Sequence, residues 1–241
     1  AVAAADLVIL ATPARVLLRQ IETLGPRLRR GGVLLDLGST KAAICQALDA
    51  LPPHVQAIGG HPMCGKEQAG LDAAEAGLYR GCTFVLCPRP SAGPEALALA
   101  LALIRRIEAR PLLLDPDQHD RLVASISHLP YLAACALVGQ ALTVATEAPA
   151  VWELAAGSFR DGTRVAASDV TMLLDILLTN QRAVLAALDG YEMHLRRLRQ
   201  LLAQGDEPAL RQLLTEMAQA RHAWARARAA HATAGSSDRA G

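Results

Sequence analysis

The stretch DLVILATP, residues 6–13, joins a short apolar run to a Thr-Pro step. An apolar run without polar alternation is typical of a strand buried on both faces of a parallel sheet. Similar runs recur along the chain with helical stretches between them: the expected strands are 7–11, 33–37, 55–59 and 83–86, and the expected helices are 14–29, 41–51 and 94–109. This order predicts an α/β fold with a doubly wound sheet.

The pattern changes near residue 115, after which nearly every stretch is helical. Residues 111–114 (PLLL) supply one more possible strand, and the DPDQHD segment that follows favours a helix start. We therefore expect an α/β domain over 1–115 followed by an all-α domain over 116–231. The end of the chain, 232–241, is rich in Ala, Gly, Ser and charge, and this composition predicts a disordered tail.

One long helix is expected between residues 168 and 204. Ser168 is suited to cap its N-terminus. Apolar residues then recur at helical spacing, at Leu173, Ile176, Leu177, Val184, Leu188, Leu195, Leu198 and Leu202. At 1.5 Å per residue such a helix is roughly 50 Å long, more than so small a domain can cover. A homodimer is expected to bury its remaining face.

Composition narrows the class of partner. The formal net charge is +1 and charged residues make up 20% of the chain, so nothing indicates nucleic acid or an acidic membrane surface, and a small-molecule partner fits better. The five cysteines form neither a CxxC pair nor a close Cys/His group, which predicts reduced thiols and no metal site. The chain shows no run of about eighteen apolar residues and no signal-peptide pattern, so we expect a cytoplasmic protein.

A dinucleotide-binding sheet opens with a strand and a GxGxxG turn that holds the pyrophosphate at a helix N-terminus. This chain has no such turn at its start, and residues 6–13 have the pattern of a middle strand. Two explanations stand at this point. Either the protein has a different α/β fold, or the first βαβ unit of a Rossmann-type sheet is missing from this chain.

Five segments together resemble the prephenate and arogenate dehydrogenase family of tyrosine biosynthesis. DLVILATP resembles that family's fourth Rossmann strand, and four further segments follow in family order: DLGSTK (36–41), GGHPMCGKEQAG (59–70), SHLPY (127–131) and FRDGTRVAASD (159–169). The resemblance covers nearly the whole chain. It implies a partial Rossmann-type, dinucleotide-binding domain without its GxGxxG unit, a helical substrate and dimerisation domain, and little activity for the chain as given.

The resemblance also implies a reaction, the oxidative decarboxylation of prephenate or arogenate with hydride transfer to NAD or NADP. His61 resembles the catalytic histidine that accepts the proton of the ring hydroxyl, a role suited to a group with an ordinary pKa of about 6.5. Ser39 resembles the serine that shares this hydroxyl contact, and Ser39, Thr12 and Pro13 are expected to contact the cofactor. Arg164 resembles the arginine that pairs with a substrate carboxylate.

Three positions near the expected pocket depart from the pattern of some family members. Tyr131 replaces a second histidine, Leu173 replaces a tryptophan, and Lys66 replaces a threonine. Tyr131 and Lys66 are expected to bind substrate, and the departures leave the choice between prephenate and arogenate open. His128 either lines the pocket or caps a helix. The residue that distinguishes NAD from NADP is expected to lie outside this chain.

Plainer roles and other functions also stand as alternatives. His61 can simply hydrogen-bond a loop, Ser39 can be an N-cap, and Arg164 can pair with a neighbouring aspartate on the surface. A Rossmann dehydrogenase of the 3-hydroxyacid type needs a catalytic lysine on a helix, but Lys41 and Lys66 are the only lysines and neither is placed in mid-helix. A non-catalytic dimerisation or regulatory module would not need Ser39, His61 and Arg164 to meet in one cleft.

Overall fold

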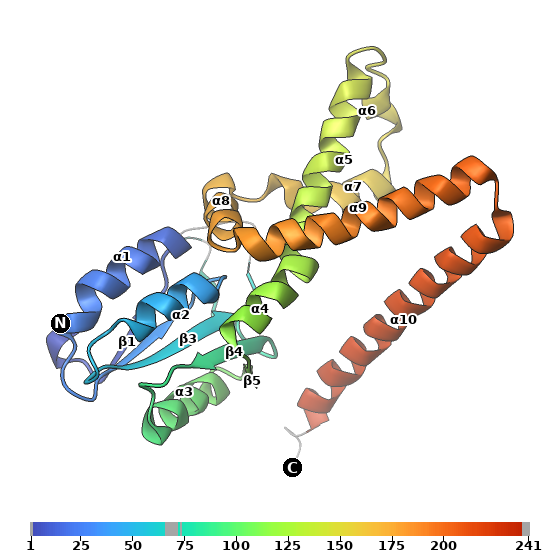
Figure 1. The fold of residues 1–241 in the computed structure, drawn as a ribbon. Coiled ribbons are helices and arrows are strands. Elements are labelled where there is room, and N and C mark those ends of the chain that lie inside the picture. Colours follow the sequence, from blue (N-terminus) through green and yellow to red (C-terminus); the bar gives the residue numbers. More distant parts are fainter. Residues whose placement is uncertain (1, 66–71, 73, 238–241) are drawn as a thin grey trace. The chain divides into compact units, whose positions relative to one another are not determined.

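The computed structural model describes residues 2–65, 72 and 74–237, with backbone only for 231–237. Its elements are drawn in Figure 1. The chain divides into two compact units, Ala1–Ala187 and Leu188–Gly241. The first unit holds the sheet and most of the helices, and the second holds the end of one long helix and all of the next. The predicted domain boundary near residue 115 stays a prediction.

The first unit is built on one five-stranded sheet in the order β1-β2-β3-β4-β5. Its strands are β1 (Leu7–Leu10), β2 (Val33–Asp36), β3 (Gln56–Pro62), β4 (Thr83–Pro88) and β5 (Arg110–Leu113). The α/β fold and the positions of the strands are confirmed. One direction was wrong: β4 pairs antiparallel with β3, whereas the other pairs are parallel. A parallel pair needs a long crossover, usually helical, and the described part of 63–82 contains no α-helix.

Helices cover the two faces of this sheet because successive strand residues point to opposite sides. On one face, Leu34 of β2 packs with residues of α1 (Ala14–Leu24) and α2 (Ala42–Asp49). On the other, Leu35 packs with residues of α3 (Pro94–Arg106). Short 3-10 turns, η1 (Val2–Ala4) and η2 (Gly25–Arg27), flank β1 and α1. The three predicted helices of the α/β part are therefore present, each somewhat shorter than expected.

A helical run follows β5. It consists of α4 (Pro116–Val123), a turn of π-helix, η4 (Ala124–His128), α5 (Leu129–Ala145), α6 (Val151–Leu154), α7 (Gly157–Thr163) and η5 (Arg164–Ala167). In α5 only Ala134 is buried, although most of the helix is apolar. Within the described residues, Pro116–Ala145 is also long and apolar enough to cross a membrane, and so are α8 and α9 taken as one bent pair. A core helix of a protein without any membrane span can pass the same test, so one or two such helices are weak evidence for a membrane.

The long helix predicted from residue 168 to residue 204 is two helices. It breaks at Asn180 into α8 (Val170–Thr179) and α9 (Gln181–Gln204), which meet at 92°. The N-cap is Asp169, whose carboxylate accepts from the Met172 amide at 2.7 Å, and not Ser168. The spacing of apolar residues could not reveal the break, because it continues across it.

The second unit contains the end of α9 and the whole of α10 (Glu207–Ser237). Gly205, with φ of 64°, lies between the two helices, in a conformation that glycine adopts without strain. The backbone of α10 is helical through 232–237, part of the segment for which a disordered tail was predicted. The rest of that segment, 238–241, lies outside the described residues.

Candidate active site

His61 lies on strand β3 itself, which continues beyond the strand expected over 55–59. It pairs with Val85 across the antiparallel β3–β4 ladder. Two glycines before it let the strand pass close to its neighbours: a methyl group at Gly60 would lie 2.4 Å from the Asp36 carbonyl oxygen, and one at Gly59 would lie 2.7 Å from Cys45 Sγ. Side chains larger than glycine therefore do not fit here, and the glycine pair brings His61 to the end of β2.

A fully buried ion pair holds the end of β2 in place. The Lys41 ammonium contacts Asp36 Oδ2, and neither side chain is exposed. The same carboxylate accepts from the Gly38 amide at 2.8 Å and the Gly60 amide at 3.1 Å. Asp36 thus joins β2, the loop after it and β3. Neither partner of this pair was predicted as functional from the sequence.

The N-terminus of α2 is capped by a residue far away in the chain. Asp120 of α4 accepts from the Lys41 amide at 2.7 Å and from the Ala42 amide at 2.8 Å. Lys41 occupies the N-cap position, so the alternative role of Ser39 as the N-cap is wrong. Ser39 is half-buried in the loop between Gly38 and the capped amides. This loop lies at the carboxyl edge of β2, where ligands of α/β sheets bind.

A second histidine links His61 to Asp120. His61 Nδ1 lies 2.8 Å from His119 Nε2, and His119 Nδ1 lies 2.8 Å from Asp120 Oδ1. The two rings meet edge to face, with centroids 5.0 Å apart. His119 is fully buried, whereas His61 keeps part of its surface exposed. His119 and Asp120 belong to the DPDQHD segment, which the sequence indicated only as a helix start.

The surroundings of His61 favour its neutral form. Burial lowers its pKa well below 6.5, and the nearby His119, Lys41 and His128 lower it further because a second positive charge is unfavourable there. Burial also lowers the pKa of His128 to about 4, against the opposing effect of Asp120. Both rings are therefore neutral near pH 7. A neutral, partly exposed imidazole can accept a proton from a bound hydroxyl.

His128 is held from the break between α8 and α9. Asn180 Nδ2 donates to the Asp120 carbonyl at 2.8 Å, which fixes the orientation of the amide, and lies 3.3 Å from His128 Nδ1. Because this amide nitrogen can only donate, His128 Nδ1 accepts. Nearby, the hydroxyls of Thr40 and Thr179 are 2.8 Å apart. His128 thus lies beside the cluster of His61, His119 and Asp120, and no capping bond from its side chain is seen at the start of α5.

Four other predicted site residues are described by the structure, Thr12, Pro13, Tyr131 and Arg164. Thr12 donates its hydroxyl proton to Gln20 Oε1 at 2.7 Å, and Pro13 is the N-cap residue of α1. Tyr131 lies on α5, where burial and the Cys135 thiol raise the pKa of its hydroxyl. Arg164 is exposed at the start of η5, which packs against α5. Their predicted roles stay predictions.

Lys66 lies outside the described residues. The other departures from the family pattern are described: Tyr131 on α5 and Leu173, which is buried on α8. Leu173 therefore contributes to packing at its present position. The predicted substrate contact of Lys66 stays a prediction.

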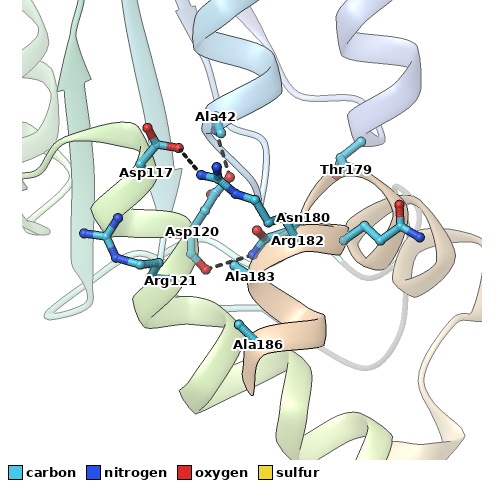
Figure 2. Close-up of a pocket in the computed structure, with 10 residues that line it drawn as sticks. Ala42, Asp117, Asp120, Arg121, Thr179, Asn180, Arg182, Ala183 and Ala186 are labelled. Carbon is cyan, nitrogen blue, oxygen red and sulfur yellow. Dashed lines mark hydrogen bonds and ion pairs between the residues drawn. The ribbon is translucent and has the colours of Figure 1, made fainter. Parts of the chain in front are cut away.

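A pocket of about 220 Å³ opens beside the N-terminus of α2 (Figure 2). It lies between α2, α4 and the first turns of α9, and Asp117 and Arg182 pair across it at 3.4 Å. Its wall includes Asp120 and Asn180, the two residues that support His119 and His128. None of the predicted site residues that the structure describes lines this pocket.

Two family models match this chain. The nucleotide-binding domain of prephenate dehydrogenase matches residues 1–113, and the dimerization domain of prephenate dehydrogenase matches residues 115–216. The cyclohexadienyl dehydrogenase of Zymomonas mobilis is 34% identical over 92% of this chain and 76% of its own length. The prephenate dehydrogenase of Lactococcus lactis is 34% identical over 88% of this chain. The chain spans only 59% of that relative.

The solved structures that this chain resembles include an arogenate dehydrogenase and a prephenate dehydrogenase. The arogenate dehydrogenase of Synechocystis superposes with a TM-score of 0.80 at 31% identity, over 92% of this chain and 80% of that one. The prephenate dehydrogenase of A. aeolicus, in complex with hydroxyphenyl propionate and NAD+, gives a TM-score of 0.81 at 28% identity, over 90% of this chain and 76% of that one.

Proposed function

Because the chain belongs to the prephenate dehydrogenase family, we propose that this protein oxidises and decarboxylates prephenate or arogenate in tyrosine biosynthesis. The observation that carries the proposal is the His61 ring, which is neutral, partly exposed and hydrogen-bonded through His119 to Asp120. The similarity to prephenate, cyclohexadienyl and arogenate dehydrogenases supports the reaction class.

His61 acts as the proton acceptor. As hydride leaves the ring carbon that carries the hydroxyl, the hydroxyl proton passes to His61, and a ketone forms. The ring carboxylate then leaves as CO2, and the ring becomes aromatic. A histidine with a lowered pKa is a weak base, but it is unprotonated over a wide pH range and therefore ready to accept.

Other residues bind and orient the substrate. Ser39 shares the hydroxyl contact with His61, and the Arg164 guanidinium pairs with a substrate carboxylate. His128, Tyr131 and Lys66 contact the same substrate. The position of η5 against α5 supports this proposal, because α5 begins directly after His128 and carries Tyr131.

The cofactor is NAD or NADP, which accepts the hydride when bound. Thr12, Pro13 and Ser39 fit such a group, because they follow the carboxyl ends of the parallel strands β1 and β2 at one edge of the sheet. Asp36 and Lys41 neutralise each other beneath this edge. The buried pair therefore supports the loop without presenting a net charge to the cofactor.

We further propose a homodimer in the cytoplasm, with cofactor binding over 1–115 and substrate binding and dimerisation over 116–231. Two large apolar side chains of α5, Leu137 and Leu142, are half exposed or more, and exposed apolar area of this kind marks an interface. The match of residues 115–216 to a dimerization domain supports the same division. The five free thiols suit a reducing compartment.

A dehydrogenase of the 3-hydroxyacid type is disfavoured by one observation. Lys41 is fully buried and paired with Asp36, so it cannot reach a substrate. Lys66, the other lysine of the chain, lies outside the described residues. The buried polar contacts of His61, His119 and Asp120 also disfavour a non-catalytic module. The meeting of Ser39, His61 and Arg164 in one cleft stays a prediction.

Absorbance of the reduced nicotinamide tests the proposal, with prephenate and arogenate each combined with NAD+ and NADP+ on the full-length protein. His61→Asn should lower kcat by roughly 10²–10⁴ with little change in KM, because a general base acts in the transition state. Arg164→Gln should instead raise KM, because a charge-assisted contact worth about 1.5–3 kcal/mol is lost.

His222→Asn is the matched control, since His222 is exposed on α10 and should leave both constants unchanged. Wild-type turnover by the His61→Asn variant would remove His61 from the mechanism. No signal from a folded protein with any of the four combinations would reject the proposed reaction.

A further inference from the structure

We propose that His119 is a positioning residue: with Asp120, it fixes the proton of neutral His61 on Nδ1 and leaves Nε2 as the lone pair that accepts the substrate proton. The direction of the hydrogen bonds is independent of the substrate. Only the use made of the free Nε2 rests on the proposed function.

Asp120 determines which atom donates in the first of the two hydrogen bonds. A carboxylate only accepts hydrogen bonds, so the contact of 2.8 Å with His119 requires a proton on His119 Nδ1. The carboxylate cannot turn away, because Oδ1 also accepts from the Lys41 amide and Oδ2 accepts from the Ala42 amide. The N-terminus of α2 therefore holds Asp120, and Asp120 sets the tautomer of His119.

The second hydrogen bond, between His119 and His61, determines which nitrogen of His61 carries the proton. A neutral His119 with its proton on Nδ1 has its lone pair on Nε2. That lone pair lies 2.8 Å from His61 Nδ1, so His61 must donate from Nδ1. Nε2 of His61 then carries no proton. A histidine side chain free in water prefers the opposite tautomer, so His61 is held in the form suited to a proton acceptor.

With His61 neutral and Asp120 ionised, one other arrangement satisfies the same two distances. If His119 were a cation, both of its nitrogens would donate, and His61 would keep its proton on Nε2 and be unable to accept there. That arrangement places a charged ring where no surface is exposed. Burying a charge in this way is costly. The two arrangements differ in one measurable property, the protonated nitrogen of His61.

Nitrogen NMR of the 241-residue chain with ¹⁵N-labelled histidine measures it. Near pH 7.5, the His61 signals, assigned by their loss in His61→Asn, should show a protonated Nδ1 and an unprotonated Nε2. His119→Gln keeps an acceptor near the position of Nε2 and should keep this tautomer. His119→Phe removes the acceptor and should shift His61 towards the Nε2-protonated form.

Kinetics give a second readout. His119→Phe should lower kcat by roughly ten- to a hundredfold, part of what a general base contributes, with little change in KM, and His119→Gln should restore most of the loss. A wild-type His61 protonated on Nε2 would overturn the proposal, and so would a folded His119→Phe variant with an unchanged tautomer. The predicted tautomer in a protein that oxidises neither substrate would uphold the positioning role and reject the proposed function.

Discussion

The polar cluster around His61 and the helix α5 differ in whether their side chains have suitable neighbours within the chain. In the cluster, Asp36, Lys41, His119 and Asp120 are buried and each contacts a partner within the same chain. Along α5, apolar side chains such as Leu142 are exposed although water is a poor environment for them. The cluster is complete within one chain, whereas the helix lacks a cover among the described residues. We therefore expect the chemistry at the cluster, and we expect a second subunit to bind at the exposed apolar side chains of α5.

Breaking the buried ion pair should have the largest effect. Asp36→Asn leaves the Lys41 charge buried without a partner, and we expect the free energy of unfolding to fall by about 3–5 kcal/mol. Urea denaturation followed by circular dichroism measures it. Asp6→Asn is the control, because the Asp6–Arg29 pair is largely exposed and should contribute under about 1 kcal/mol. Equal losses in both variants would contradict the contrast between buried and exposed pairs.

Lowering the pH should destabilise the folded chain through the buried ring of His128. His128 has a pKa of about 4 in the folded chain and about 6.5 when unfolded, so the unfolded chain binds its proton first as the pH falls. The resulting loss of stability, about 3 kcal/mol, should develop from pH 6.5 down to pH 4. His61 acts in the same direction.

Urea midpoints at several pH values measure this dependence. His128→Gln should flatten it, and His222→Asn should leave it unchanged. A His128→Gln variant with the slope of the wild type would show that burial of His128 does not cause the loss.

A charge on the exposed helix should weaken assembly and leave the fold intact. Leu142→Glu is expected to raise the dimer dissociation constant about 30-fold, equivalent to roughly 2 kcal/mol, because it places a charge in an apolar interface. Analytical ultracentrifugation measures the constant. Gln140→Glu places the same charge at an exposed polar position of α5 and should have a smaller effect. A wild-type chain that is monomeric at every concentration would contradict the expected role of α5.

Removing the N-cap of α4 should have the smallest effect on the free energy of unfolding. Asp115 accepts from the amides of Asp117 and Gln118 and caps α4, the helix that carries His119. Asp115→Ala should lower the free energy of unfolding by about 1 kcal/mol, and Asp115→Asn should retain most of it. Thermal unfolding distinguishes the two. A loss as large as that of Asp36→Asn would mean that the cap supports more than one helix.

The sequence predicted the family and the strands, because short apolar runs and the order of motifs are local features. It did not predict the buried partners. His119 lies 58 residues from His61 in the chain, and Asn180 lies 60 residues from Asp120. Contacts across such separations leave no periodic signal. The antiparallel direction of β4 was missed for the same reason, since direction depends on the connection rather than on the strand.

The π-helical turn η4 shifts the angular phase of α5 relative to α4. The Leu129 amide donates to the Ala124 carbonyl, five residues back, so the turn holds one residue more than an α-helical turn. In an unbroken α-helix, at about 100° per residue, Asp120 and His128 would point roughly 80° apart. One added residue reduces this angle to about 20°. Both residues then face Asn180. Straightening η4 into an α-helical turn with every residue kept would turn His128 away from that amide, whereas deleting one residue of the turn would restore the α-helix and preserve this phase.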